Sequence, residues 1–342
     1  FKSLYLTGLA SFLIIMFSFI IPLSVDIDNQ IAGNNKSKIN SSKTDFEKVL
    51  SGETIDDKEK VDEGLDLSNI LEDVFKFDEL PEDTVRLSAS TIEQLFKDTN
   101  YSLSEVRRTK KVKPIRLSLL PNEMKSIESS GKRKSLFIKI ILPLVLEENN
   151  RINIDRKKLF TILNKNKNSK DEIKWLNQKF KQYGVLNKDL ATLKVRMDII
   201  PVSLAIAQAA KETGWGTSRF AIEGNALFGQ WTWSGEGIKP AGADTDATYK
   251  VMKFNVLKAS VRAYQRNLNT HSSYKKFRFV RAQLRDDNKK LNSLKLAEYL
   301  DNYAQTGTEY TKVLKQIIQQ NELQDFDEVK LLPLSIKYKN II

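Results

Sequence analysis

The chain has 342 residues and a formal net charge of +12, with 55 Lys and Arg residues against 43 Asp and Glu residues. It contains no Cys and a single histidine, His271, which excludes thiol nucleophiles, disulfides and zinc sites built from several His or Cys ligands. Acid–base chemistry is left to carboxylates, Tyr and Lys, so a hydrolase with this inventory is most naturally a carboxylate enzyme such as a glycosidase. We expect no metal and no cofactor.

The positive charge favours a polyanionic partner, such as a nucleic acid, an anionic lipid surface or an acidic wall polymer. The sequence carries no zinc finger, Gly-rich phosphate loop or RNP-type run, so we expect no nucleic-acid partner. A lysine content that only reflects an AT-rich genome is an equally good explanation of the charge.

Residues 1–25 are interpreted as a signal peptide or membrane anchor. Leu4 to Val25 is an apolar run of about the length that spans a bilayer. Lys2 precedes the run and Asp26 follows it, an arrangement that suits a cytoplasmic N-terminus and an exported chain. Because no clean small-x-small cleavage signal closes the run, we favour an anchor.

The rest of the chain divides by composition into a disordered spacer, a helical N-terminal extension, the main domain and a tail without a usable pattern: residues 26–87, 88–150, 151–325 and 326–342. The extension ends in a strongly apolar, amphipathic stretch at 135–149, which carries Lys139 and Pro143. This stretch is too short for a membrane span, and we interpret it as a core helix.

A buried helix is predicted to begin at Pro201, which suits a first helical position, and to end at Gly214. Small and apolar residues lie almost all round it, as in a helix enclosed by others. Glu212 lies in the last turn and shares a face with Gln208 and Trp215 by helical spacing. A glutamate near an apolar helix end, beside an indole, is a candidate acid with a raised pKa. A solvent-facing glutamate on an ordinary core helix is the alternative.

A small β-hairpin is predicted after this helix, because Tyr249 to Phe254 alternates like a strand and follows an aromatic segment and a polar loop. The aromatic and acidic residues of the hairpin are Trp231, Trp233, Glu236, Asp244, Asp246 and Tyr249. Concentrated aromatics on an irregular segment are typical of carbohydrate contact, although one or two of the tryptophans can also be core residues.

Five separated motifs then point to one family, in the order Gln208-Ala-Ala-Lys-Glu-Thr-Gly-Trp-Gly-Thr-Ser218, Asn225-Ala-Leu-Phe-Gly-Gln230, Tyr249-Lys-Val-Met-Lys-Phe254, Ala259-Ser-Val-Arg-Ala-Tyr264 and Asn302-Tyr-Ala…Tyr310. Together they resemble the bacterial endo-β-N-acetylglucosaminidases of glycoside hydrolase family 73. Asn267-Leu-Asn-Thr-His-Ser-Ser-Tyr274 is similar to the Bax-type branch of that family. The likeness covers roughly residues 134–320.

The resemblance implies a mainly α, lysozyme-like helical domain with a small β-hairpin lobe beside the cleft. It also implies cleavage of the β-1,4 bond on the N-acetylglucosamine side of peptidoglycan. Glu212 falls at the family's catalytic acid position, and Tyr303 at the tyrosine that flanks the reacting sugar. The family's second carboxylate lies in the β-lobe, where Glu236, Asp244 and Asp246 all qualify.

The catalytic route stays open at this point. If a second carboxylate takes part, its separation from Glu212 decides between inverting and retaining hydrolysis. A substrate-assisted route would need only Glu212 and orienting groups such as Tyr303. His271 is expected to cap or pack. The expected substrate-binding residues are Trp215, Asn225, Phe228, Trp231, Trp233 and Tyr249.

The resulting expectation is a monomeric peptidoglycan hydrolase of the bacterial cell envelope. Its partners would be glycan strands and, through the N-terminal segment, the inner membrane, with the main domain in the periplasm. A lysozyme-like lytic transglycosylase and a non-catalytic wall-binding module are the alternative interpretations.

Overall fold

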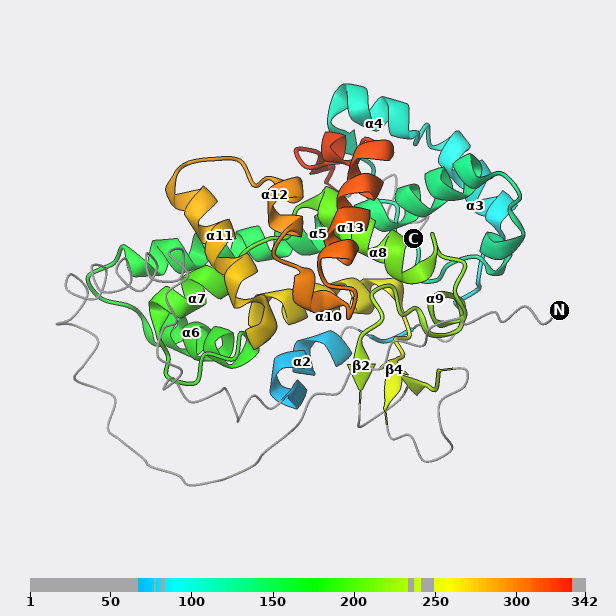
Figure 1. Ribbon diagram of the computed structural model, residues 1–342. Helices are drawn as coiled ribbons and strands as arrows, with labels where there is room; N and C mark the ends of the chain where they lie inside the picture. Colours follow the sequence, from blue (N-terminus) through cyan, green and yellow to red (C-terminus); the bar gives the residue numbers. More distant parts are fainter. Residues whose placement is uncertain (1–66, 77, 81–83, 233–236, 241–248, 334–342) are drawn as a thin grey trace.

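The computed structural model describes residues 67–76, 78–80, 84–232, 237–240 and 249–333, which are mostly helical (Figure 1). The α-helices are α2 (Leu67–Phe75), α3 (Ala89–Asp98), α4 (Leu103–Thr109), α5 (Ser130–Leu163), α6 (Lys170–Gln182), α7 (Leu190–Arg196), α8 (Val202–Thr213), α9 (Arg219–Gly224), α10 (Leu257–Thr270), α11 (Lys275–Asp286), α12 (Ser293–Ala297) and α13 (Thr308–Gln320). The 3₁₀ turns are η1 (Asn122–Ser126), η2 (Ser272–Tyr274), η3 (Asp301–Tyr303) and η4 (Leu323–Phe326). The strands are β1 (Lys111–Val112), β2 (Trp231–Thr232), β3 (Gly237–Ile238), β4 (Lys250–Met252) and β5 (Lys330–Leu331). The mainly helical fold agrees with the predicted fold class.

Helix α8 lies in the middle of the core. It packs against α5, α13 and η4, and residues 202–210 are all buried, as predicted for an enclosed helix. The helix begins one residue later than expected because Pro201 is its N-cap, and Gly214 ends it in the left-handed conformation with φ 57°. At its start, Asp327 accepts hydrogen bonds of 2.8 Å from both the backbone N–H and the hydroxyl of Ser203. These contacts fix the start of α8 in the core.

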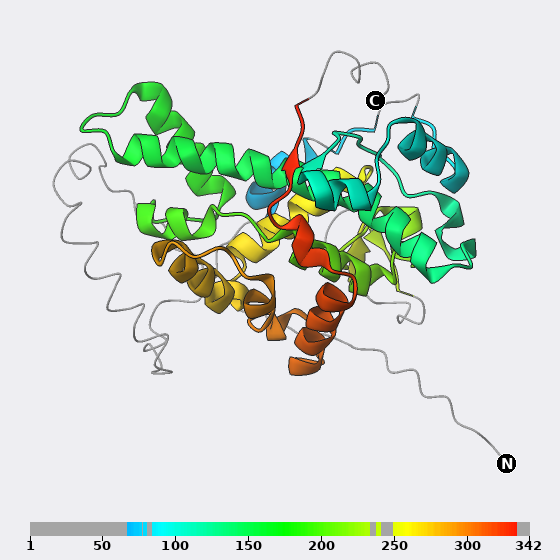
Figure 2. The ribbon, with the colours of Figure 1, turned by 90° about the horizontal axis from the view of Figure 1, so that it is seen from above.

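Helix α5 is one continuous helix that is much longer than the core helix predicted at 135–149. It runs through residue 150, the predicted boundary between the extension and the main domain, and Figure 2 shows it crossing much of the molecule. The polar stretch near the boundary stays helical because its charges have buried partners: Glu148 forms ion pairs with Arg151 and Arg262. The predicted boundary at 150 therefore falls inside a helix.

The extension and the main domain share one hydrophobic core, to which residues of α3, α5, α8, α10 and α13 all contribute. Strand β1 of the extension pairs in parallel with β5, with Lys111 opposite Lys330. Arg107 also donates to Asp325 across 3.0 Å. The extension and the first residues of the predicted tail are thus integral to the domain.

No helix in the described part of the chain is both long and apolar enough to cross a membrane. The apolar stretch at 135–149 is buried inside the domain as part of α5. The predicted span at residues 4–25 lies outside the described residues.

Helix α2 corrects the expectation that residues 26–87 form a disordered spacer. It packs against α6 and α10 beneath the main domain (Figure 1). Ile70, Leu71 and Val74 form a small core cluster with residues of β4 and α10. The sequence pattern was too weak to predict this docking, since only one face of a short helix is apolar. Residues 26–66 lie outside the described part of the chain.

The predicted hairpin is a three-stranded antiparallel sheet with the order β2-β4-β3, which we call the β-lobe. Trp231 pairs with Val251, and Ile238 also pairs with Val251 from the other side. A side chain at Gly237 would come within 2.6 Å of Lys250 Cβ, which explains a glycine there. The lobe is joined to α9 through Gly224 O, which accepts from Phe254 N across 2.8 Å.

Candidate active site

Glu212 lies in the last turn of α8, where Gly214 turns the chain away. Its Oε1 accepts a hydrogen bond of 2.9 Å from the hydroxyl of Tyr310 on α13. On its other side, a Cβ at Gly229 would lie 3.4 Å from Glu212 Oε2. Gly229 has φ +60°, a conformation that glycine adopts without strain. The two carboxyl oxygens therefore face different surroundings, a tyrosine hydroxyl and a glycine backbone.

Tyr310 belongs to a hydrogen-bonded chain that reaches into the core. Gln208 Nε2 donates to Tyr310 Oη across 3.1 Å, and Tyr264 Oη donates to Gln208 Oε1 across 2.6 Å. All three side chains are buried. Gln208 lies one helical turn before Glu212, and both side chains hydrogen-bond to the Tyr310 hydroxyl, which confirms the face predicted for these two residues. Trp215, predicted on the same face, lies beyond the end of α8.

Electrostatics at Glu212 favour an acid that can hold its proton. Burial raises the pKa of Glu212, while the hydrogen bond from Tyr310 and the charge of Lys211 act in the opposite direction. Burial also raises the pKa of Tyr310 and of Tyr264 well above the ordinary value. These tyrosines are therefore neutral hydroxyl donors near neutral pH. A carboxylic acid in such surroundings is suited to proton donation.

Tyr303 lies beside this pair and does not bond to Glu212 in the structure. Its ring stacks on Tyr310, with centroids 5.4 Å apart and planes 9° apart, and its hydroxyl donates to Phe228 O across 2.9 Å. Tyr274 follows at 5.9 Å from Tyr303. The three rings form a tyrosine stack contributed by η2, η3 and α13, next to the end of α8.

Asn225 and Phe228 are buried, and their side chains support the site from within. Asn225 has φ 48° and donates from its amide to the carbonyl oxygens of Phe254 and Asn255. The ring of Phe228 stacks on Tyr264 at 3.8 Å. These contacts fix the segment that carries Gly229. The substrate contact expected of the two side chains stays a prediction.

The predicted aromatic residues occupy two separate places. Trp231 is 38% exposed and packs edge-on against Tyr249 at 5.2 Å, which gives the β-lobe an accessible aromatic pair. Trp215 instead packs against Phe137 at 5.9 Å, with Lys134 over its ring at 5.1 Å. The indole ring was expected to lie beside Glu212, but the side chains around Glu212 are largely tyrosines.

The remaining predicted site residues lie outside the described part of the chain: Trp233, Glu236, Asp244 and Asp246. Their assignment stays a prediction. Within the described residues, no group of three or more His, Asp or Glu side chains is arranged to hold a metal ion. His271 accepts from Ser273 N at Nδ1 across 3.3 Å and caps η2, as expected.

The sequence did not predict the role of Tyr310, although this residue ends the Asn302…Tyr310 motif. The available signal was a second tyrosine in that motif, but Tyr303 on η3 and Tyr310 on α13 do not share a helix, so helical spacing does not relate them. The motif alone does not show which of the two tyrosines points to the glutamate. The role of Tyr264, which ends the Ala259–Tyr264 motif, was not predicted for the same reason.

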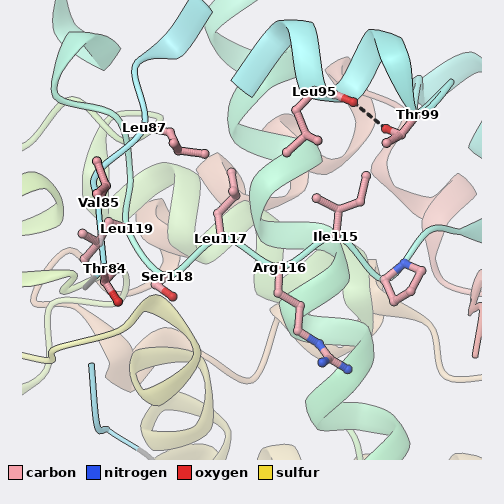
Figure 3. Close-up of a pocket in the computed structure, with 11 residues that line it drawn as sticks. Thr84, Val85, Leu87, Leu95, Thr99, Ile115, Arg116, Leu117, Ser118 and Leu119 are labelled. Carbon is pink, nitrogen blue, oxygen red and sulfur yellow. Dashed lines mark hydrogen bonds between the residues drawn. The ribbon is translucent and has the colours of Figure 1, made fainter. Parts of the chain in front are cut away.

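A separate pocket of about 150 Å³ lies between α3 and the extended segments 84–87 and 114–119 (Figure 3). Its lining is largely apolar, and Arg116 at its edge is engaged by Glu147 at 2.5 Å. No predicted site residue lines it. The pocket is a packing feature of the extension and is distinct from the surroundings of Glu212.

Comparisons with known proteins identify a family for the segment that carries these residues. The family model Glucosaminidase, described as mannosyl-glycoprotein endo-beta-N-acetylglucosaminidase, matches residues 187–323, the segment that contains Glu212, the β-lobe and the tyrosine stack. Such a domain points to glycosidase action on a glycan. Protein bax of Escherichia coli (strain K12) is 33% identical over 214 residues, which is 60% of this chain and 75% of that protein. The chain belongs to this Bax-type family of glucosaminidase-domain proteins. No solved structure matches the chain.

Proposed function

We propose that this protein is a peptidoglycan hydrolase of glycoside hydrolase family 73, which cuts the β-1,4 bond after N-acetylglucosamine. The observation that carries the proposal is the carboxyl group of Glu212, enclosed at the end of a buried helix and hydrogen-bonded by Tyr310. It lies inside the segment that matches the glucosaminidase family. A partly buried acid of this kind is the minimum that glycosidic cleavage requires.

In this proposal, Glu212 gives its proton to the leaving glycosidic oxygen as the C–O bond breaks. Trp231 and Tyr249 offer aromatic faces to sugar rings, and Tyr303 flanks the reacting sugar. The positive charge that develops at the sugar is met by a second carboxylate, Glu236, Asp244 or Asp246, or by the N-acetyl oxygen of the substrate. Three variants, each with one of these carboxylate residues changed to alanine, are compared in activity with Tyr303→Phe to distinguish these routes.

Replacement of Glu212 by Gln tests the central assignment. Gln keeps the size of the side chain and can still accept from Tyr310, but it cannot act as an acid. We expect digestion of purified peptidoglycan to slow by a factor of about 100 or more. Glu223→Gln, which changes an exposed carboxylate on α9, is the matched control and should digest at the wild-type rate. Wild-type digestion by a folded Glu212→Gln protein would rule out the assignment.

The class of reaction is read from the products. Mass analysis of released fragments should show reducing N-acetylglucosamine ends. Anhydro-sugar ends would identify a lytic transglycosylase instead, and binding without release would identify a wall-binding module. Because the family description names mannosyl glycoproteins, a high-mannose glycoprotein is the second substrate to test.

We place the protein in the bacterial cell envelope, with its domain in the periplasm and its attachment through residues 4–25. The apolar run in the sequence supports this proposal. Cell fractionation with an antibody to the main domain tests it, since an anchored protein stays in the membrane fraction at high salt. Sedimentation of the domain tests the expected monomer.

A further inference from the structure

The chain from Tyr264 through Gln208 and Tyr310 to Glu212 has one direction. Tyr264 donates to the amide oxygen of Gln208, the amide nitrogen donates to Tyr310, and Tyr310 donates to Glu212 Oε1. Because Tyr310 Oη already accepts from Gln208, its own hydrogen is left for the carboxyl group. Every donor in the chain points towards Glu212.

The opposite orientation of the Gln208 amide is disfavoured by the same contacts. With oxygen and nitrogen exchanged, Gln208 would donate to Tyr264, whose hydrogen would have no acceptor among the described residues. Tyr264 is fully buried, and an unsatisfied buried hydroxyl is costly. The observed orientation satisfies all of these hydroxyl hydrogens.

We propose that Tyr310, held by Gln208 and Tyr264, is a positioning residue that fixes Oε1 of Glu212 as an acceptor, so that Oε2 carries the transferable proton. A carboxylic acid that accepts a strong hydrogen bond at one oxygen carries its hydrogen at the other. Oε2 faces Gly229, where the missing side chain leaves room for the proton to reach a substrate oxygen. After transfer, the same tyrosine stabilises the carboxylate.

The groups around Glu212 make the titration of this residue a sensitive readout. The titratable groups that act on it or feel its charge come from five elements, and they are Lys211 on α8, Tyr264 on α10, Tyr274 on η2, Tyr303 on η3 and Tyr310 on α13. Of the tyrosines, Tyr310 is the one that hydrogen-bonds to the carboxyl group. Its hydrogen bond lowers the pKa of Glu212 against the effect of burial.

The first test is Tyr310→Phe, which removes only the hydroxyl. The midpoint of the Glu212 titration should move to higher pH, because the ionised form loses its donor. It can be followed by NMR of ¹³C-labelled glutamate side chains, with the Glu212 signal assigned by its loss in Glu212→Gln. Tyr101→Phe, which removes another buried hydroxyl where Tyr101 donates to Lys139 O at 3.0 Å, is the control and should leave the midpoint unchanged.

The second test uses Gln208→Met, alone and combined with Tyr310→Phe. Alone, Gln208→Met should raise the titration midpoint of Glu212 less than Tyr310→Phe does, since Tyr310 keeps its hydroxyl hydrogen but loses the hydrogen bond from Gln208. In the double variant it should add nothing further, because its effect passes through Tyr310. An additive effect would mean that Gln208 acts on Glu212 independently, and would overturn the chain as drawn.

The kinetic part rests on the proposed function. For Tyr310→Phe, kcat should fall about tenfold with KM nearly unchanged, and the basic limb of the pH–rate profile should shift upward with the NMR midpoint. An inactive wild type with a midpoint that responds to Tyr310→Phe would reject the hydrolase proposal and keep the positioning role. An unchanged midpoint in a folded Tyr310→Phe protein would overturn the positioning role, whatever the activity.

Discussion

Glu148 shows how a single buried charge holds two helices of this fold together. It is 1% exposed on α5, where Arg151 on the same helix and Arg262 on α10 bind its two oxygens. Burial alone would raise its pKa, but the hydrogen bonds and charges of the two arginines lower it to about 2. Removing one partner of such a pair leaves an uncompensated buried charge, which is strongly destabilising.

The sign of this shift predicts acid sensitivity. The folded-state pKa of Glu148 lies below its ordinary value of 4.5, so its stabilisation is complete above pH 4.5 and is lost as the pH falls towards 2. The loss is on the order of 3 kcal/mol. In urea unfolding, Glu148→Gln should be less stable than wild type at pH 6 and should lose less stability between pH 4.5 and 2.5. Glu105→Gln removes an exposed carboxylate paired with Arg108, where solvent screens the interaction, and should change the slope much less. An unaltered slope in Glu148→Gln would contradict the prediction.

At the residue scale, the sequence allowed prediction of what is local. The shared face of Glu212 and Gln208 follows from helical spacing, and the end of α8 follows from Gly214. The partnership of Glu212 with Tyr310 joins residues 98 positions apart, and no periodicity encodes such a contact. The burial of Asn225 and Phe228 was also missed, since a motif alone does not show whether a residue touches substrate or supports the backbone.

At the element scale, helix α2 links the N-terminal part of the chain to the β-lobe. Val74 is fully buried beside residues of β4 and α10. Asp73 binds Arg266 across 2.8 Å. Beyond the helix, Asp78 accepts from the backbone N–H groups of Asn255 and Val256, where β4 leads into α10. The segment therefore holds the base of the β-lobe.

Val74→Asp should release α2, because it places an unpaired charge in the apolar contact. We expect a loss of stability of about 2–4 kcal/mol and faster amide exchange in both residues 67–80 and β4. Phe75→Asp changes the next residue, which is 49% exposed, and should leave both quantities near wild type. Faster exchange confined to residues 67–80 would show that α2 is docked but does not support the lobe.

Helix α5 shows why element boundaries were harder to predict than element types. Residues 147–156 are charged or amide residues apart from Ile152 and Ile154, and the stretch resembles a solvated connection. In the fold, Asn149 donates to Ile200 O across 2.8 Å, and Lys179 pairs with Asp155 at 2.6 Å. Tertiary partners thus make polar residues compatible with a buried helix, and these partners come from distant parts of the chain.

At the scale of the whole molecule, the positive charge is concentrated at one end. Residues 151–196, which include the last turns of α5 together with α6 and α7, carry 13 Lys and Arg against 4 Asp and Glu. This segment, the basic lobe, therefore accounts for nine of the twelve net charges. It has its own small core and projects at one end of the molecule, beyond α10 and away from the β-lobe (Figure 1). A uniform lysine excess from genome composition would not by itself produce this asymmetry.

The basic lobe should bind the anionic bacterial wall by long-range attraction. Lys157, Lys167, Lys170 and Lys174 are exposed there and form no ion pair among the described residues. Attraction between exposed charges is screened over about 8 Å at physiological ionic strength, so binding of the Glu212→Gln protein to purified sacculi should weaken as salt is added. Changing these four lysines to Gln should reduce both the affinity at low salt and its salt dependence.

The matched control changes Lys97, Lys125, Lys132 and Lys276, which are exposed outside the lobe, and alters the net charge equally. Equal losses in the two variants would show that net charge alone matters, and salt-insensitive binding would leave Trp231 and Tyr249 as the source of affinity.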